Sequence, residues 1–532
     1  MRRGTAAVAV AIAAAAVAAA CRTRPAPAAF DLEEATVQTL LQDQQSGRRT
    51  ARQIAEQYLA RIQALDRSGP TLNSIIELNP DALTIADELD AQRRSSGLRG
   101  PLHGIPVVIK DNIDTADRMS TTAGSLALEG SIAARDAFIV GRLRAAGAVI
   151  LGKTSLSEWA NFRSMHSTSG WSGRGGLVRN PFALDRSACG SSSGTGAAVA
   201  ANLATIGVGT ETDGSILCPS AVMSLVGIKP TVGLVSRAGI IPIAHSQDTA
   251  GPMARTVEDA AILLDVLAAP DSRDSATADG SRPGRIDYRA SLDPDGLRGA
   301  RIGVARAKLF GYSEVTDRIV NAAIERMKPL GAVIVDPADI PNAGTYDDSE
   351  LEVLLYEFKA DLDAYLGALG PAAKVHSLAD VIAFNDANRA REMPYFGQEL
   401  MLEAQKKGPL TDKAYRDALA RNARLSRKEG IDAVMDRLHL DALVAPTLSP
   451  PWTIDLVNGD HFVGASTTPA AVAGYPSITV PAGYAFGLPV GVSFIGGRWS
   501  EAQLIKYAYA YERASKHRRP PTFPATTTAG IQ

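Results

Sequence analysis

Two glycine- and serine-rich turns constrain this chain more than any other feature. The first is Gly190–Gly194 (G-S-S-S-G) and the second is Gly209–Ser215 (G-T-E-T-D-G-S). Between them, the small residues of Ala197–Leu203 predict a closely packed helix, and Thr205–Gly209 predicts a buried strand. The pattern therefore predicts that two turns next to a buried sheet each present a serine hydroxyl, one as a nucleophile and the other as its helper.

A lysine ends another buried strand, upstream of both turns. The run Gly104–Asn112 is apolar as far as Lys110. Partial desolvation at the end of a buried strand lowers the pKa of a lysine and makes its amine available as a base. Lys110, Ser191 and Ser215 are therefore a candidate Ser-Ser-Lys hydrolytic triad.

The residues alone leave other interpretations open. The first turn also matches G-x-S-x-G, which would make the chain an α/β-hydrolase esterase with Ser192 as the nucleophile of a strand-to-helix elbow. That alternative needs an acid and a histidine downstream, and Asp455 and His461 are available. Serine-glycine clusters are also common as plain loops and helix caps, and a lysine at a strand end is often simply solvated.

The order of motifs along the chain resembles that of the amidase signature hydrolases. The matching segments are Leu72–Ser74, Cys189–Thr195, Gly209–Pro219, Gly227–Gly233, Gln247–Met253, Ala445–Thr447, Ala473–Gly483 and Leu488–Gly491. The resemblance implies an α/β protein with the amidase signature fold, in which helices flank both faces of a mixed, largely parallel central sheet. Short apolar strands alternate with helical segments between residues 100 and 268, and this alternation favours the same fold class.

The resemblance also implies roles for the triad. Ser215 is expected to attack an amide carbonyl and form an acyl-enzyme. Ser191, after a cis peptide bond, is expected to relay the proton to a neutral Lys110. Backbone N–H groups are expected to stabilise the oxyanion, and those groups belong to Thr212, Asp213, Gly214 and Ser215. The resemblance implies no cofactor and no metal ion.

Four residues depart from the common family pattern without touching the triad. Ser193 and Asp213 stand where glycine is usual, Glu211 replaces an aspartate, and Leu217 replaces an arginine. Together with Val232–Arg237, these details resemble bacterial peptide amidases, which release ammonia from C-terminally amidated peptides. The expected reaction is hydrolysis of a C–N amide bond, releasing ammonia or an amine. Aryl, fatty and small aliphatic amides are the alternative substrates.

The charge balance bears on the rival functions. The chain has 57 acidic and 55 basic residues, a net charge of −2, so it has no basic surplus for nucleic acid. This argues against a relative of the amidotransferase component that works on aminoacyl-tRNA. The intact triad argues against a binding protein built on an inactive scaffold.

Cys189 and Cys218 flank the two turns. They either form a disulfide or remain small buried thiols, and we prefer the buried thiols. The histidines and cysteines show no zinc spacing.

The N-terminus predicts export. Arg2 and Arg3 precede the apolar stretch Ala6–Ala20, which is shorter than the roughly 20 residues of a spanning helix. Residues 1–20 therefore predict a signal peptide, ending either at an acylated Cys21 or at a plain cleavage site. Residues 21–30 are then predicted to form a tether. The predicted location is the periplasm or, through a lipid anchor, the envelope.

Residues 31–532 are predicted to form one amidase domain with a mainly helical variable region at about 316–437. In its N-terminal part, Ile54, Tyr58 and Ile62 recur at a helical interval of four. The segment Asp81–Arg94 is also predicted to be helical, and Arg301–Ala305 is predicted to be a strand.

Overall fold

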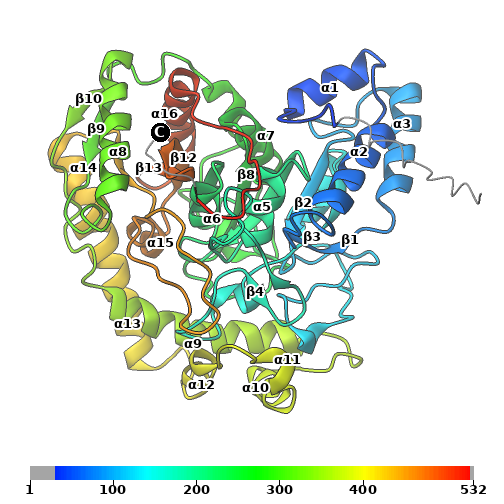
Figure 1. The fold of residues 1–532 in the computed structure, drawn as a ribbon. Helices are drawn as coiled ribbons and strands as arrows, with labels where there is room; N and C mark the ends of the chain where they lie inside the picture. Colours follow the sequence, from blue (N-terminus) through cyan, green and yellow to red (C-terminus); the bar gives the residue numbers. More distant parts are fainter. Residues whose placement is uncertain (1–29, 528–532) are drawn as a thin grey trace, which may run out of the picture.

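An 11-stranded sheet forms the centre of the protein (Figure 1). The computed structural model describes residues 30–527, so the predicted signal peptide, Cys21 and nearly all of the predicted tether lie outside the described residues. In spatial order the strands are β1 (Ile75–Leu78), β3 (Val149–Thr154), β2 (Pro106–Lys110), β6 (Ile206–Glu211), β8 (Thr249–Ala254), β7 (Val226–Lys229), β12 (Ser477–Ala485), β13 (Leu488–Ile495), β11 (Ala442–Pro446), β9 (Arg301–Val304) and β10 (Val333–Val335). A separate pair is formed by β4 (Trp171–Ser172) and β5 (Gly176–Leu177).

The sheet is mixed, with its parallel pairs in two blocks. One block joins β3, β2 and β6, and the other joins β11, β9 and β10. Between the blocks, β8, β7, β12 and β13 pair antiparallel. The predicted α/β class and the mixed sheet with flanking helices are confirmed. Alternating strands and helices predict parallel pairs, and antiparallel neighbours such as β12 and β13 are instead joined by a tight hairpin.

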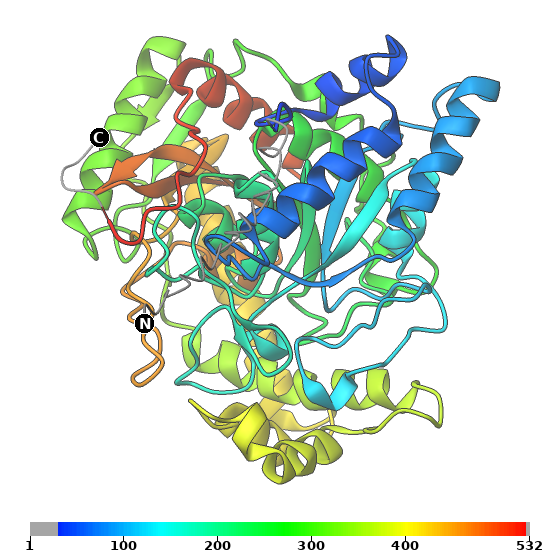
Figure 2. The same cartoon turned by 45° about the vertical axis from the view of Figure 1, so that its right-hand side comes forward.

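Helices cover the sheet and form a separate layer below it (Figures 1 and 2). In chain order they are α1 (Val37–Gln45), α2 (Ala51–Leu65), α3 (Ala82–Ser96), α4 (Phe138–Ala145), α5 (Ser193–Ala200), α6 (Leu217–Val222), α7 (Val257–Leu267), α8 (Glu314–Met327), α9 (Asp347–Gly367), α10 (Leu378–Ala387), α11 (Arg389–Glu392), α12 (Glu399–Gln405), α13 (Lys413–Ala423), α14 (Asp432–Leu438), α15 (Thr468–Ala473) and α16 (Glu501–Ser515). Every residue of β12 and β13 is buried, so both faces of the sheet are covered there.

The predicted N-terminal helices are present. In α2 the Thr50 hydroxyl and the Gln53 side chain form a reciprocal capping box, which fixes the start of the helix. Ile54, Tyr58 and Ile62 are all buried, as their spacing of four predicts. The predicted helix Asp81–Arg94 is found as α3, and the predicted strand at Arg301 is β9.

The small-residue helix between the two turns is α5, and it starts earlier than predicted. The sequence predicts Ala197–Leu203, whereas the helix runs from Ser193 to Ala200. All of its residues are buried. A Cβ atom at Gly194 would lie 2.3 Å from the Ser74 carbonyl oxygen, so only glycine fits there. The small side chains therefore let α5 approach the sheet closely and fix the first turn directly at its N-terminus.

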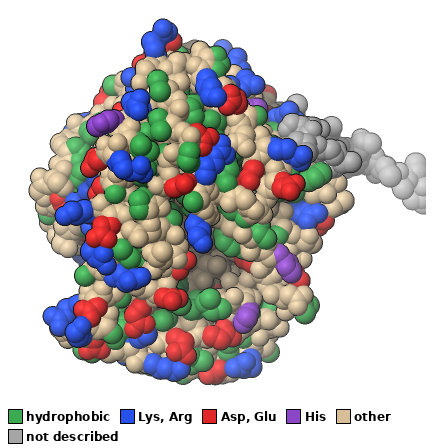
Figure 3. All heavy atoms as spheres, turned by 90° about the vertical axis from the view of Figure 1, so that its left-hand side faces the viewer, with side chains coloured by type: hydrophobic (Ala, Val, Ile, Leu, Met, Phe, Trp, Pro, Cys, Tyr) green, Lys and Arg blue, Asp and Glu red, His purple; other side chains and the backbone are tan. Residues whose placement is uncertain are grey.

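The predicted variable region is mainly helical. It contains α8 at its start and α9–α13 at the base of the molecule in both ribbon views, while β10 adds one edge strand (Figures 1 and 2). Figure 3 shows a hollow where the upper body meets the lower part of this face. None of the helices among residues 30–527 has the length and apolar character required to cross a membrane.

Candidate active site

The amine of Lys110 lies at the centre of a fully buried hydrogen-bonding group at the end of β2. Its Nζ is 2.7 Å from Ser191 Oγ, 2.8 Å from Thr210 Oγ1 and 3.2 Å from the Thr210 carbonyl oxygen. A neutral amine has two N–H donors and one lone pair. The protonated amine donates to all three oxygens. Once Lys110 is neutral, Nζ keeps two donors, and its lone pair can accept the Ser191 hydroxyl proton across the 2.7 Å contact.

The surroundings of Lys110 favour its neutral form. Burial lowers the pKa of Lys110 to about 7, because the charged amine loses its hydration. The nearby carboxyls of Asp248 and Glu211 act in the opposite direction and limit the fall of this pKa. Near neutral pH a large fraction of the molecules therefore carries an uncharged Lys110, which is the form that a general base requires.

Main-chain contacts bring the two serine turns together. The Gly190–Ser191 peptide bond is cis, as the family resemblance implies. The Ser192 N–H donates to the Ser215 carbonyl oxygen at 3.1 Å, which joins the first turn to the second. Lys110 and Ser191 are completely buried, while Ser215 retains 7% exposure. Of the three predicted triad residues, Ser215 is thus the one that solvent can reach.

The second turn presents free backbone donors. Gly214 has a φ of +75°, a conformation that glycine adopts at little cost. The Glu211 carboxylate accepts from the N–H groups of Ile216 at 2.7 Å and Leu217 at 2.9 Å, so it holds the start of α6. Among residues 30–527, no acceptor is bonded to the N–H groups of Asp213, Gly214 or Ser215. These three donors remain available to a bound anion.

Two residues beside the triad were not assigned a role from sequence. Thr210 accepts both hydrogen bonds from Lys110, and Asp248 accepts from the Thr212 hydroxyl at 2.6 Å. Asp248 also accepts from the N–H groups of Ile243 and Ala244, so it joins the second turn to the segment at 240–248. Both residues lie inside segments that carry the family resemblance, and that position was the only sequence signal for them.

A cavity of about 410 Å³ adjoins this polar group. Thr210 and Thr212 line it, together with Asp361 and Tyr365 from α9. Neither Ser191 nor Ser215 is among its lining residues. The cavity therefore adjoins Thr210, the residue that accepts the hydrogen bonds of Lys110.

The structure does not support Ser192 as an elbow nucleophile. Its hydroxyl is completely buried, donates to the Thr210 carbonyl oxygen at 3.1 Å and accepts from the Thr210 N–H at 3.3 Å. Asp455 and His461 do lie in contact, with 3.0 Å between Oδ2 and Nε2, and His461 is largely exposed. An elbow nucleophile needs an exposed hydroxyl, so Ser192 instead holds the first turn against β6.

Cys189 and Cys218 form a disulfide, so our preference for buried free thiols was wrong. The contact between Ser192 and Ser215 draws the two turns together and leaves the cysteine Cα atoms 6.1 Å apart, within the usual range for a disulfide. Because Cys189 precedes the cis bond and Cys218 lies in α6, the disulfide links the two turns covalently.

Replacing both cysteines by serine is expected to lower the free energy of unfolding by roughly 3–4 kcal/mol. The bridge closes a loop over a sequence separation of 29, and loop-closure entropy in the unfolded chain gives that magnitude. Urea unfolding of the wild type and the double variant measures the difference. A reductant should lower the stability of the wild type and leave that of the double variant unchanged. Equal stabilities without reductant would contradict this role.

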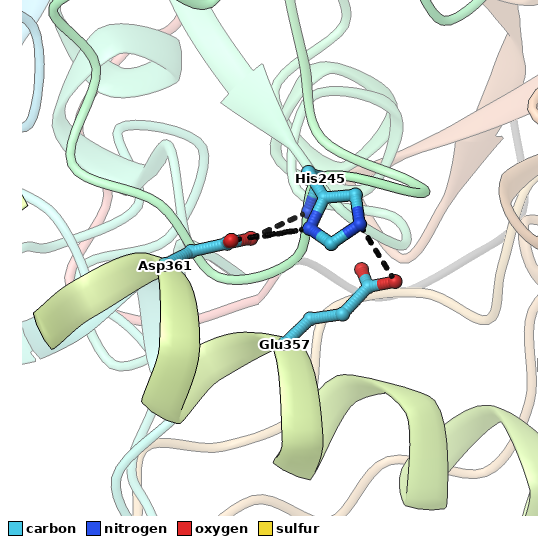
Figure 4. Close-up of side chains that lie close together, drawn as sticks. All are labelled: His245, Glu357 and Asp361. Carbon is cyan, nitrogen blue, oxygen red and sulfur yellow. Dashed lines mark hydrogen bonds and ion pairs between the residues drawn. The ribbon is translucent and has the colours of Figure 1, made fainter. Parts of the chain in front are cut away.

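The His245 ring lies between two carboxylates of α9 (Figure 4). Its Nδ1 is 2.8 Å from Asp361, and its Nε2 is 3.3 Å from Glu357. The hydrogen bond with Asp361 raises the pKa of His245. The three side chains also have a metal-ligand composition. However, the ring nitrogens face different carboxylates, which suits a doubly protonated imidazolium that fastens the 240–248 segment to α9.

Replacing His245 by alanine is expected to destabilise the protein in acid more than in alkali. A raised pKa means that the native state binds the proton more tightly than the unfolded chain does. The stabilisation is therefore complete below the unfolded pKa of about 6.5 and is lost as the pH rises through the raised native value. Unfolding curves at pH 5.5 and 9.5 test this. An equal loss at both values would show that the imidazolium contributes nothing.

Comparisons with known proteins agree with this geometry. The family model described as amidase matches residues 53–505. A peptide amidase of Stenotrophomonas maltophilia has 52% sequence identity and a TM-score of 0.89, over 93% of this chain and 99% of that one. A probable amidase of Arabidopsis thaliana is 42% identical over 94% of this chain and 93% of its own length.

A glutamyl-tRNA(Gln) amidotransferase subunit from Symbiobacterium thermophilum is 34% identical, over 91% of this chain and 97% of that protein. The relatives thus include both amidases and an amidotransferase subunit, and the peptide amidase and the probable amidase named above are more similar in sequence than this amidotransferase subunit. With the match of the family model, these likenesses make the chain an enzyme that hydrolyses C–N amide bonds and a member of the amidase family.

Proposed function

We propose that Ser215 is the nucleophile, that Ser191 relays its proton and that Lys110 is the base. The observation that carries this proposal is that Nζ of the buried Lys110, whose pKa burial lowers to about 7, lies 2.7 Å from Ser191 Oγ. As Ser215 Oγ attacks the amide carbonyl, its proton passes to Ser191 while the Ser191 proton passes to Lys110. This relay would carry the proton from the partly exposed Ser215 to the buried base Lys110.

The free N–H groups of the second turn take the developing negative charge. Those of Asp213, Gly214 and Ser215 have no acceptor among the described residues, and the N–H of Thr212 completes the predicted set. Donors of this kind act mainly in the transition state, and removing one typically costs about 10²–10³ in rate. The proton held by Lys110 then returns through Ser191 to the leaving nitrogen. Ammonia or an amine departs, and water hydrolyses the acyl-enzyme.

The proposed substrates are peptides with a C-terminal amide. Support comes from the peptide amidase of Stenotrophomonas maltophilia, with 52% identity over nearly the whole chain, and from the motif details around the two turns. The reaction removes ammonia and leaves a free C-terminal carboxylate. Ammonia release from a C-terminally amidated dipeptide is the direct test, with aryl, fatty and small aliphatic amides assayed in parallel.

Turnover of the dipeptide amide with kcat/KM at least tenfold above that of the other amides supports this assignment. Preference for an aryl, fatty or aliphatic amide would overturn the peptide assignment while leaving amide hydrolysis intact. The alternative, an aminoacyl-tRNA amidotransferase, predicts that the chain acts on misacylated tRNA within a complex of partner proteins. Activity of the isolated chain on peptide amides would exclude that dependence.

We also infer export to the periplasm or the envelope. The basic start at Arg2 and Arg3, the apolar stretch before Cys21, and the Cys189–Cys218 disulfide support an oxidising compartment. The N-terminal mass of protein expressed in a bacterium tests this. A lipid on Cys21 would indicate an envelope anchor. A cleaved N-terminus without a lipid would indicate a periplasmic enzyme. An intact Met1 in the cytosol would contradict export.

A further inference from the structure

Four exposed apolar side chains lie on two loops that meet at the surface. Met165 is 67% exposed and lies in loop 163–170. In loop 447–467, Val457 is 87% exposed, Phe462 53% and Val463 58%. We call these four residues the apolar rim. Single exposed apolar residues are ordinary, whereas several of them on two loops in contact with each other are a candidate interaction site.

Polar contacts hold the two loops as one surface. The Asp460 N–H donates to the Ser167 carbonyl oxygen at 3.2 Å, and the Asp460 carboxylate accepts from the Ser169 N–H at 3.0 Å and hydroxyl at 2.5 Å. Gly459 has a φ of +82°, and a Cβ atom there would lie 2.7 Å from the His166 carbonyl oxygen. The loops are therefore in close contact, and their apolar side chains are presented on a fixed support.

The Asp455–His461 pair also supports the rim. Asp455 accepts from the N–H groups of Val457 at 2.8 Å and Asn458 at 2.9 Å, and from His461 at 3.0 Å. The pair folds the tip of loop 447–467 back on itself. The acid and histidine of the elbow alternative thus have a structural role beside Val457 and Phe462.

Each loop leads directly to one of the two serine turns. At the end of loop 163–170, the Gly170 N–H donates to Ser157 Oγ at 2.8 Å, and the Ser157 N–H donates to the Ser191 carbonyl oxygen at 3.1 Å. Loop 447–467 ends at Thr467, whose Oγ1 would lie 3.2 Å from a Cβ at Gly214. The rim is therefore connected to both sides of the nucleophile.

The number of residues between the rim and the second turn limits the distance between them. Val463 is four residues from Thr467, so their Cα atoms lie at most about 14 Å apart. An extended peptide covers about 3.3 Å per residue, so three to five residues span such a distance. A peptide whose C-terminal amide is at Ser215 is therefore long enough to place upstream side chains on the rim.

We propose that the apolar rim binds apolar side chains three to five residues upstream of the scissile C-terminal amide. This inference rests on the proposed function, because it assigns a second contact region to the same peptide-amide substrate. Burial of a leucine or phenylalanine side chain against the rim stabilises the complex by enough to raise kcat/KM about tenfold. The rim thus sets a preference for longer, apolar peptide amides.

The test compares three substrates: a dipeptide amide, a hexapeptide amide with leucine three to five residues from its amide, and the same hexapeptide with serine there. Val457, Phe462 and Val463 are replaced by serine in a triple variant. A second variant, Val457→Ser with Val463→Ser, keeps the Phe462–Trp452 ring contact. Val333→Ser, at an exposed position on the edge strand β10, is the matched control.

The wild type and the control should prefer the leucine hexapeptide about tenfold in kcat/KM over the serine one. The triple variant should lose this preference through a higher KM, with dipeptide turnover unchanged. The inference would be overturned if both rim variants still preferred the leucine hexapeptide, or if the wild type showed no such preference. Turnover of the dipeptide amide would in that case still support the proposed function. No ammonia from any peptide amide would overturn the proposed function, and with it the rim.

Discussion

Replacing Ser215 by alanine is expected to lower kcat for amide hydrolysis by about 10⁴-fold or more. The change removes the oxygen that forms the acyl-enzyme, and triad residues act as a unit, so loss of one removes most of the rate enhancement. Ser215 retains 7% exposure, and its carbonyl oxygen accepts a hydrogen bond from the Ser192 N–H. Alanine keeps this main-chain contact, so the variant should fold normally. Ammonia release under saturating substrate measures the effect.

Ser192→Ala is the informative control, because it tests the neighbouring hydroxyl in the same turn. Ser192 is bonded to the Thr210 main chain, so its loss should reduce stability and leave kcat within about tenfold of the wild type. Undiminished turnover by Ser215→Ala, together with an inactive Ser192→Ala, would reverse the assignment of the two serines.

Replacing Lys110 by methionine is expected to abolish activity while making the protein more stable below neutral pH. Loss of the base should lower kcat by about 10³-fold or more, since the serine pair then has no proton acceptor. In the wild type, the rate should rise with pH through about 7, where Lys110 loses its proton. A rate that stays constant from pH 5 to 9 would contradict a lysine base.

The stability effect follows from the sign of the pKa shift. The native pKa of Lys110 is about 7, against about 10.4 in an unfolded chain. Between these values the unfolded state binds more protons, so the stability of the wild type rises with pH across this window. The free energy that burial of the charged lysine costs the native state therefore has its full value below about pH 7 and disappears above about pH 10.4.

Methionine has a similar length and no charge, so it avoids this cost. The melting temperature of Lys110→Met minus that of the wild type should be largest at pH 6 and should shrink towards pH 10. A variant that is less stable than the wild type at pH 6 would show that the hydrogen bonds of Lys110 outweigh its desolvation. Lys110→Arg is the matched control, because arginine keeps its charge throughout and should lose both activity and stability.

Local patterns along the chain predicted the elements that hold the triad. Glycine spacing placed both turns, the apolar run before Lys110 predicted β2, and the interval of four at Ile54 predicted α2. These features depend on neighbours in sequence. The start of α5 at Ser193 was missed because the serines of the first turn also suit a loop, and burial against the sheet decides between the two.

Contacts between distant segments could not be predicted from local pattern. The disulfide depends on the Ser192–Ser215 contact, and the roles of Thr210 and Asp248 depend on how β2, β6 and the 240–248 segment meet. Asp455 and His461 are in contact as the elbow alternative required, yet they support a surface loop. Composition and spacing indicate which residue types are available, while the fold determines which of them meet.

Trapping of the acyl-enzyme tests the role of Ser215 most directly. Wild-type protein is mixed with a C-terminally amidated dipeptide, quenched in acid during turnover and digested for tandem mass spectrometry. The peptide containing Ser215 should gain the mass of the substrate less ammonia, with the label on Ser215, and Ser215→Ala should gain none. A label on Ser192 or Ser191, or labelling that persists in Ser215→Ala, would contradict Ser215 as the nucleophile.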